Sequence, residues 1–175
     1  MQIRPCTPAD LSAVTAIYQH HVLHGSGSFE IEPPDLTEMT HRYDDVISKP
    51  LPYLVAILDD AVLGYAYANF FRPRPAYRFC VENSVYVAQN TTQKGIGRAL
   101  MTELMRQCEV LGARQMVAVI GDSANKASIS LHTSLGFSHT GQLQATGWKH
   151  NRWLDTVLMQ KTLGLGNESS PSSLN

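Results

Sequence analysis

The sequence contains little cysteine, little net charge and no long apolar run. Its three cysteines, Cys6, Cys80 and Cys108, are odd in number and widely spaced, which indicates reduced thiols in a cytoplasmic protein and no disulfide framework. The formal net charge of -1 at pH 7 provides no basic field for nucleic acid or an anionic membrane. No apolar run approaches the roughly 20 residues of a membrane span, and the N-terminal residues lack the apolar core of a secretory signal. We therefore expect a soluble, cytoplasmic protein without nucleic-acid or membrane partners.

The composition is that of one folded domain. Hydrophobic residues make up 43% of the 175 residues and charged residues 17%, which is typical of a globular chain with a substantial core. The last twelve letters, GLGNESSPSSLN, are polar and low in complexity. We expect a domain over residues 1–163 and a disordered tail over 164–175.

Hydrophobic periodicity predicts a mixed α/β fold. Thr7, Pro8 and Asp10 suit the start of a helix, and apolar residues recur at helical spacing from Leu11 to Val22. Asp59-Asp60-Ala61 is a plausible hairpin turn. Further helices are expected at Leu36–Ile47, Ile96–Leu111 and Asn125–Leu135, and strands at Gln2–Arg4, Tyr53–Leu58, Val62–Phe71, Phe79–Val87, Met116–Ile120, Ser138–Leu143 and Asp155–Met159. This order predicts a mixed sheet with helices on both faces.

A glycine pair opens the third predicted helix. Gly95 and Gly97 stand where a strand leads through a polar turn into a helix, and Lys94 and Arg98 add two positive charges. Free backbone N–H groups and the helix dipole at such a turn attract phosphate. Position 100 is leucine, so the three-glycine dinucleotide pattern is incomplete, and no G-K-S/T follows for a P-loop. The sequence predicts a diphosphate site of another kind.

Two stretches, taken together, resemble the GNAT superfamily of acetyl-CoA-dependent acyltransferases. Thr92–Gly97 (TQKGIG) matches the superfamily pattern Q/R-x-x-G-x-G/A, with Thr92 where Gln or Arg is usual. Asn125–Phe137 (NKASISLHTSLGF) matches N-x-x-S-x-x-x-(Y/H)-x-x-x-G-F. The resemblance implies a mixed, mostly antiparallel central sheet flanked by helices. It also implies acetyl-CoA as cosubstrate and no metal.

The resemblance narrows to the branch of phosphinothricin acetyltransferase and related amino-acid detoxifying enzymes. It implies an acetyl group moving to the amino group of a small amino-acid-like substrate such as phosphinothricin or methionine sulfoximine. The matching segments cover nearly the whole chain before the tail: Ser28–Pro34, Ala66–Tyr77, Val81–Val87, Val117–Asn125 and Gly147–Asp155.

The resemblance assigns the coenzyme to three segments. The first is a strand whose backbone pairs with the pantetheine amides while one N–H faces the thioester oxygen, a donor that stabilises an oxyanion. The second is the glycine turn, and the third is the helix after Asn125. The implied coenzyme-binding residues are Val85, Tyr86, Val87, Gln93, Lys94, Gly95, Ile96, Gly97, Arg98, Asn125 and Ser134.

Two residues are candidates for proton transfer. An ammonium group must lose a proton before it attacks a thioester, and Glu82 lies in an otherwise apolar strand where partial burial would raise its pKa. The pattern alone fits an outward-facing strand carboxylate equally well, and the resemblance favours the base. His132 could protonate the departing thiolate or relay a proton, or it could simply pack beside the coenzyme.

The substrate is expected to meet a loop rich in arginine. Arg72 and Arg74 could bind a carboxylate bidentately, although loop arginines are often merely solvated. The remaining substrate-binding candidates are Phe29, Glu30, Tyr77, Asn83 and Ser84. His20 and His24 are four residues apart without an acidic or cysteine partner, so we expect no metal site.

The segment GWKHNRWLD resembles the dimer-contacting part of the branch. Trp148 and Trp153 among charged residues suit an interface with an apolar centre and a polar rim, which predicts a homodimer. Lys149, His150 and Arg152 could then close the neighbouring subunit's site.

Two alternative functions remain at this point. One is acetylation of a polyamine or a protein N-terminus. A polyamine pocket requires acidic residues, whereas the expected substrate loop contains Arg72 and Arg74. The other is a non-catalytic module that binds acetyl-CoA. Glu82 and His132 argue against the second alternative.

Overall fold

The computed structural model describes residues 1–91 and 95–171. These form one seven-stranded sheet in the order β1-β2-β3-β4-β5-β7-β6. The strands are β1 (Gln2–Pro5), β2 (Tyr53–Leu58), β3 (Ala61–Phe70), β4 (Cys80–Val87), β5 (Gln115–Gly121), β6 (Ser138–Lys149) and β7 (Arg152–Thr162). The helices are α1 (Leu11–His24), α2 (Leu36–Ile47), α3 (Ile96–Val110) and α4 (Lys126–Ser134), with 3-10 turns at Pro8–Asp10, Pro75–Tyr77 and Gln89–Thr91.

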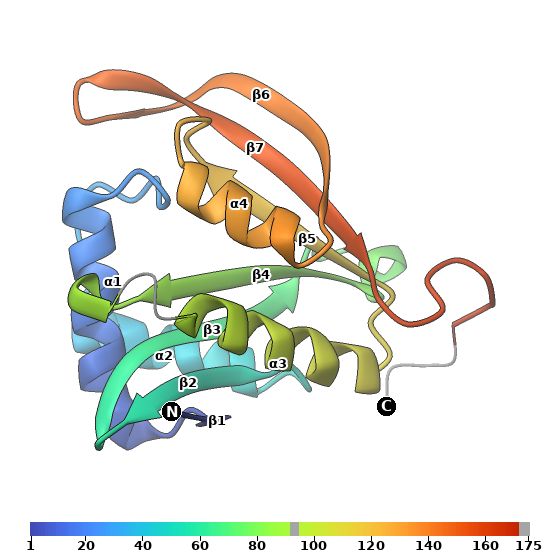
Figure 1. The fold of residues 1–175 in the computed structure, drawn as a ribbon, viewed down its shortest axis with the longest axis horizontal. Helices are drawn as coiled ribbons and strands as arrows, with labels where there is room; N and C mark the ends of the chain where they lie inside the picture. The colour runs from blue at the N-terminus through green and yellow to red at the C-terminus, as the bar shows by residue number, and fades with distance from the viewer. Residues whose placement is uncertain (92–94, 172–175) are drawn as a thin grey trace.

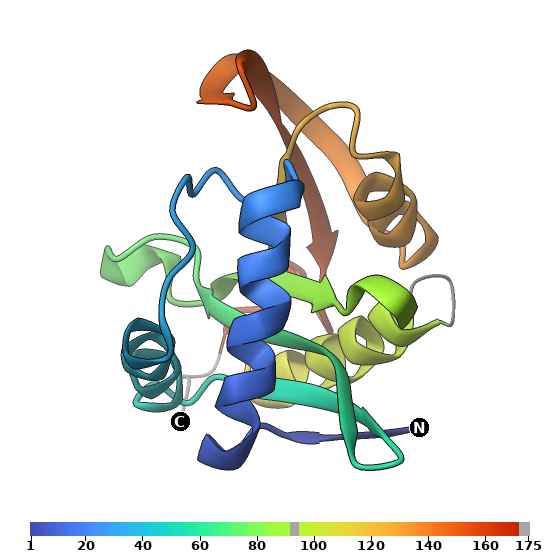
Figure 2. The same ribbon diagram turned by 90° about the vertical axis from the view of Figure 1, so that its left-hand side faces the viewer.

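The sheet is antiparallel except at its centre. Only the β4–β5 pair is parallel, and every other neighbouring pair is antiparallel. Helices α1 and α2 cover one face and α3 and α4 the other (Figures 1 and 2). This arrangement confirms the predicted fold class. Within the described residues, no helix is long and apolar enough to cross a membrane.

Carboxylate side chains hold the chain at the N-terminal ends of α1 and α2. Asp10 accepts hydrogen bonds from the backbone N–H and the hydroxyl of Thr7, both at 2.8 Å, and binds the Arg4 guanidinium at 2.7 Å. Asp35 accepts from the Glu38 N–H at 2.8 Å and caps α2. The Asp35 bond satisfies an otherwise unpaired N–H at the start of α2, and the Asp10 bonds fix the 3-10 turn that leads into α1.

Helix α3 buries a continuous apolar stripe on the sheet. Its buried residues recur three to four positions apart, the spacing of one helix face: Ile96, Leu100, Met101, Leu104 and Cys108. They join one hydrophobic core with the inward residues of β2, β3 and β4. This packing fixes the N-terminus of α3 beside the end of β4.

The opposite face carries stacked tyrosines beneath α1 and α2. Tyr65 and Tyr67 stack at 6° between ring planes, and Tyr53 stacks on Tyr65 at 8°. Tyr86 continues the stack from β4 and meets Tyr18 of α1 edge to face. Aromatic neighbours on a sheet add stability beyond the area they bury.

The β6–β7 hairpin is longer than its sequence pattern suggested. The expected strands ended at Leu143 and resumed at Asp155, whereas the ladder continues to a tight turn at His150 and Asn151, where φ is 51° and 56°. An irregularity in the register between Leu143 and Gly147 interrupts the alternation of apolar and polar residues. Because the alternation is interrupted there, hydrophobic periodicity does not predict the outer half of the hairpin.

The chain after β7 contacts Arg114, the residue before β5. Leu163 is buried and donates its N–H to the Arg114 carbonyl, and the Arg114 guanidinium donates to the Gly166 carbonyl at 3.3 Å. Residues 172–175 lie outside the described residues. The predicted domain boundary at residue 163 stays a prediction.

Candidate active site

A cleft opens where β4 and β5 part. The two strands pair only from Cys80 with Gln115 to Glu82 with Val117, and then both continue without pairing to each other. A cavity of about 1160 Å³ lies between them and reaches α1, α3 and α4. Among the predicted site residues, those that line it are Glu82, Asn83, Ser84, Val85, Tyr86, Val87, Gly95, Ile96, Gly97, Arg98, Asn125, His132 and Ser134.

The N-terminus of α3 forms the end of this cavity. Gly95 has a φ of 74°, which glycine adopts without strain, and directly precedes the helix. A side chain at Gly97 would place its Cβ 3.2 Å from Leu131 and 3.7 Å from Val87. The turn therefore keeps clear space beside the first N–H groups of α3, as a diphosphate requires. Gln93 and Lys94 lie outside the described residues.

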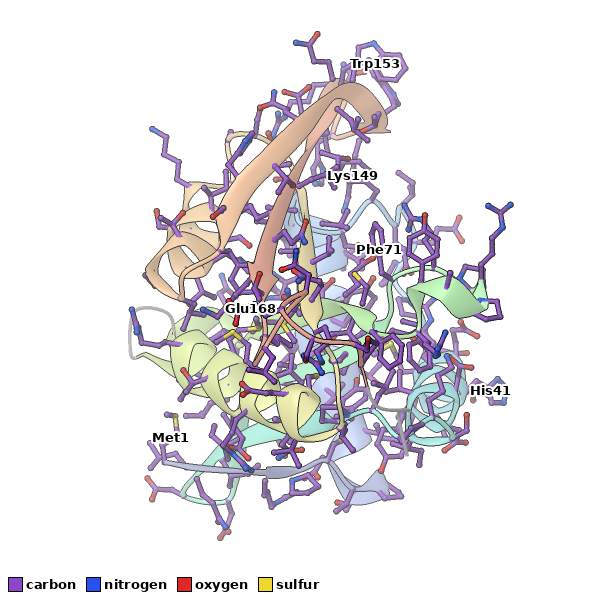
Figure 3. All side chains as sticks on the ribbon, turned by 90° about the vertical axis from the view of Figure 1, so that its right-hand side faces the viewer. Met1, His41, Phe71, Lys149, Trp153 and Glu168 are labelled. Atoms are coloured by element: carbon purple, nitrogen blue, oxygen red, sulfur yellow. The ribbon has the colours of Figure 1, made fainter. Side chains whose placement is uncertain are left out.

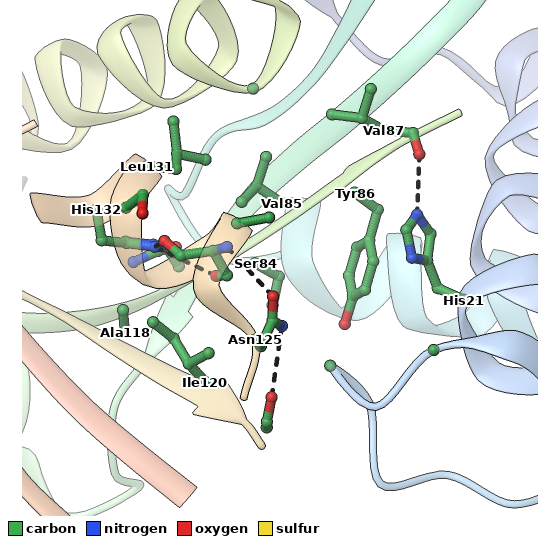
Figure 4. A pocket seen from close by; sticks show the side chains of 18 of the residues that line it. His21, Ser84, Val85, Tyr86, Val87, Ala118, Ile120, Asn125, Leu131 and His132 are labelled. Atoms are coloured by element: carbon green, nitrogen blue, oxygen red, sulfur yellow. Dashed lines mark hydrogen bonds between the residues drawn. The ribbon is translucent and has the colours of Figure 1, made fainter. Parts of the chain in front are cut away.

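The last part of β4 has a strand partner on one side only. Val85, Tyr86 and Val87 pair with β3, and their other edge faces the cavity. Figure 4 shows His21 reaching from α1 to the Val87 carbonyl, to which its Nε2–H donates at 2.9 Å. Burial lowers the pKa of His21. Sequence reasoning missed His21, although it lies three positions after Tyr18 on the buried side of α1.

Helix α4 closes the cavity opposite α1. The Asn125 side chain accepts from the Ser128 N–H at 3.2 Å and so caps the helix, while its amide donates to the Gly121 carbonyl at 3.4 Å. His132 is 2% exposed and points toward β4, where its Nε2 lies 3.0 Å from Oδ1 of Asn83. Burial lowers the pKa of His132.

Glu82 is a half-buried carboxylate at the point where the strands part. Burial raises the pKa of Glu82, and the positive charge of Arg72 acts in the opposite direction. The expected partial burial is therefore confirmed. The role of Glu82 as a base stays a prediction.

Five predicted substrate residues lie outside the cavity lining. Arg72 stacks over the Phe71 ring at 4.2 Å, and Arg74 and Tyr77 are exposed in the loop between β3 and β4. Glu30 accepts from Arg42 at 2.6 Å and from the Tyr18 hydroxyl at 2.7 Å. The fifth, Phe29, packs against glycines of β5 and β6.

The tip of the β6–β7 hairpin holds the loop between α1 and α2. The Lys149 ammonium donates to the Ser28 carbonyl at 2.7 Å, and the His150 ring donates to the Gly25 carbonyl at 3.1 Å. Lys149 and Trp153 both lie near this tip, and Figure 3 shows Lys149 toward the body of the molecule and Trp153 farther out. The residues expected to close a neighbouring subunit's site thus contact their own chain.

Arg152 strengthens this attachment through a buried carboxylate. It forms an ion pair with Asp122, which is 4% exposed and follows β5. Gly25, Ser26 and Gly27 of the attached loop line the cavity. The hairpin therefore shapes one wall of the candidate site from outside the cavity.

Comparisons with known proteins agree with this geometry. The chain is 49% identical over 169 residues to a phosphinothricin N-acetyltransferase of Alcaligenes faecalis, covering 97% of this chain and 86% of that relative. It is 38% identical over 173 residues to an L-methionine sulfoximine/L-methionine sulfone acetyltransferase of Salmonella typhimurium, covering 99% of each. A crystal structure of a GNAT superfamily phosphinothricin acetyltransferase from Sinorhizobium meliloti, in complex with AcCoA, matches with a TM-score of 0.95 and 46% identity, covering 98% of this chain and 93% of that one.

The family follows from a match along most of the chain. The model of the acetyltransferase (GNAT) family matches residues 14–137. The protein belongs to the acetyltransferase (GNAT) family, which confirms the resemblance carried by the glycine turn and the segment from Asn125 to Phe137.

The contact between Phe29 and Gly147 yields a test of the hairpin's role. A Cβ at Gly147 would lie 2.5 Å from two atoms of the Phe29 ring, so Gly147→Ala should push the ring away and lower the free energy of unfolding by about 1–3 kcal/mol. A Cβ at Gly141, also in β6, would meet no atom within 4 Å, so Gly141→Ala should be nearly neutral. Urea unfolding measures both. Equal effects at the two positions would contradict the contact.

Proposed function

We propose that the protein transfers an acetyl group from acetyl-CoA to the amino group of a small amino-acid-like substrate. The observation that carries this proposal is the parting of β4 and β5, which brings an unpaired strand edge, a glycine-flanked helix N-terminus and a half-buried glutamate to one cavity. The names of the two acetyltransferase relatives described above support the same reaction.

The cavity offers the coenzyme a separate place for its diphosphate and for its pantetheine arm. Its diphosphate would meet the N-terminus of α3 at Gly95–Arg98, and its pantetheine amides would pair with the free edge of Val85–Val87. The cavity volume of about 1160 Å³ is of the size that such a ligand needs. Asn125 and Ser134 line the side nearest α4. Contacts from Gln93 and Lys94 stay predictions.

Glu82 acts as the base of the reaction. It takes one proton from the substrate ammonium, directly or through a water, and the neutral amine attacks the thioester carbon. The carbon–nitrogen bond forms, the carbon–sulfur bond breaks, and the coenzyme thiolate receives the second proton that the nitrogen loses. Backbone N–H groups at the free edge of β4 stabilise the charge that develops on the thioester oxygen.

The substrate's carboxylate is held by the arginines between β3 and β4. Arg72 is the stronger candidate because its charge reaches Glu82, whose pKa it lowers against the effect of burial. A substrate bound between the two would present its amine to Glu82 and its carboxylate to Arg72. Arg74 and Tyr77, exposed in the same loop, extend this surface, and Ser84 lines the cavity beside Glu82. Contacts of Phe29 and Glu30 with the substrate stay predictions.

We also propose that the protein forms a homodimer in the cytoplasm through the outer face of the β6–β7 hairpin. Trp148 and Trp153 pack edge to face with centroids 5.2 Å apart and are 51% and 62% exposed. Large apolar side chains gathered on one exposed surface indicate a binding partner.

Light scattering at micromolar concentration should give twice the chain mass of 19.3 kDa. Trp153→Ser should shift the mass toward the monomer, because it removes the most exposed aromatic of the pair. Leu165→Ser, at an exposed residue of the C-terminal turn, is the matched control and should leave the mass unchanged. A monomer mass for the unmodified protein would end the proposed dimer.

Gly97→Val should raise the Kd of acetyl-CoA by at least about tenfold, since a branched side chain would fill the space beside the first turn of α3. Calorimetry on the folded variant measures this. Gly141→Val, on a strand surface away from the cavity, should leave the Kd unchanged. Unaltered affinity in a folded Gly97→Val protein would show that the diphosphate lies elsewhere.

Glu82→Gln should lower kcat by about 10²–10⁴, the usual contribution of general-base catalysis, with little change in acetyl-CoA affinity. The wild-type rate should fall as pH drops through the raised pKa of Glu82, and the variant should lack this dependence. The deficit should shrink at high pH, because more of the substrate amine is then already neutral. Glu103→Gln, on the outer side of α3, is the control. A wild-type kcat for Glu82→Gln at neutral pH would exclude Glu82 as the base.

Free thiol release from acetyl-CoA with a panel of amino acids and matched amines tests the reaction and the carboxylate clamp together. Arg72→Ala, and to a smaller degree Arg74→Ala, should raise KM for amino acids while sparing amines that lack a carboxylate. Arg78→Ala, in the same loop with its guanidinium over Phe79, should change neither. Binding of acetyl-CoA without thiol release from any compound would favour a non-catalytic module.

A further inference from the structure

The point where β4 and β5 part is occupied by a side chain. Glu82 and Val117 are the last residues that the two strands pair, and Asn83 is the next residue of β4. Its side-chain amide donates to the Val117 carbonyl at 3.0 Å. Asn83 is 7% exposed, so this bond is made inside the protein. A side chain thus satisfies the last paired β5 residue at the position where the backbone ladder stops.

The other end of the Asn83 side chain is held by α4. Its Oδ1 lies 3.0 Å from Nε2 of His132, and Nδ1 of His132 lies 2.8 Å from the Ser128 carbonyl. The ring of His132 also meets the Phe137 ring edge to face, with centroids 4.9 Å apart. One chain of contacts therefore runs from α4 through His132 and Asn83 to β5.

These contacts engage the side chains of both His132 and Asn83. A neutral imidazole carries one N–H, which on Nε2 donates to Asn83 while Nδ1 can accept from the Ser128 hydroxyl at 3.4 Å, so proton transfer to the coenzyme thiolate would first have to break the bond to Asn83. Oδ1 and one amide N–H of Asn83 are engaged as well, so only its second amide N–H is left for the predicted contact with the substrate unless the bond to Val117 is broken. A buried carbonyl left without its donor is destabilised by more than the bond was worth.

We propose that Asn83 holds β4 and β5 apart at the inner end of the cleft, and that His132 is the positioning residue that orients the Asn83 amide. We call the contacts from His132 through Asn83 to Val117 the bridge. Removing the bridge lets β4 and β5 close or shift where the acetyl group must sit. The inference rests on the proposed function for its effect on catalysis, but the bridge itself is a property of the fold.

Two substitutions of His132 separate positioning from proton transfer. The amide nitrogen of glutamine can take the place of Nε2 and still donate to Asn83, whereas the amide of asparagine reaches only the place of Nδ1. His132→Gln should keep kcat and the acetyl-CoA Kd within about threefold of wild type. His132→Asn should raise the Kd and lower kcat by about tenfold or more, the effect of leaving a buried polar group unpaired. His139→Asn, on the exposed part of β6, is the control.

Asn83→Leu keeps the branched shape of the side chain and removes both bonds. It should match His132→Asn in acetyl-CoA affinity and in Tm, and the double variant should be no worse than either, because both break one bridge. If His132→Gln and His132→Asn lose kcat equally while binding acetyl-CoA as wild type does, His132 transfers a proton and the proposal is wrong. Additive losses of Tm in the double variant would also overturn it. These Tm and affinity measurements decide the bridge even if the wild-type protein releases no thiol, which would end only the proposed function.

Discussion

The end of one parallel ladder is the constraint on which the rest of the site depends. Strands β4 and β5 exchange backbone hydrogen bonds over three residue pairs and then diverge, so each strand carries an edge without a strand partner into the middle of the sheet. Unpaired backbone inside a protein must find other partners. The His21 ring and the Asn83 amide provide two of them. Water, or a peptide-like ligand laid along the cleft, must provide the remainder.

The sequence predicted those parts of the fold and site that are local in the chain. The third helix and its glycine turn, the cap at Asn125 and the half-buried position of Glu82 each depend on neighbouring residues, so periodicity and turn chemistry could locate them. The structure gathers these segments at one cavity because α3 and α4 follow the two strands that part.

Long-range contacts were beyond sequence reasoning. The residues around His132 and Asn83 in the sequence do not predict that the two side chains meet, because they lie 49 residues apart and on different elements. The sequence does not distinguish His21 from the other histidines of its helix, because its partner, the Val87 carbonyl, lies on β4. The outer part of the hairpin follows an irregular register that periodicity does not predict. The contact of Lys149 with Ser28, which lies 121 positions earlier in the same chain, also has no signal in the sequence.

The attachment of the hairpin to the loop after α1 has a consequence for the order in which the enzyme matures during synthesis. The loop leaves the ribosome early, but the residues that hold it, Lys149 and His150, are made more than a hundred residues later. Loop-closure entropy makes such distant pairings late events in folding. A nascent chain can therefore form α1, the tyrosine stack and the α3 packing while one wall of its cleft is still loose. The cleft is completed only after β6 and β7 of the sheet have been translated, so termination before β7 leaves an incomplete site.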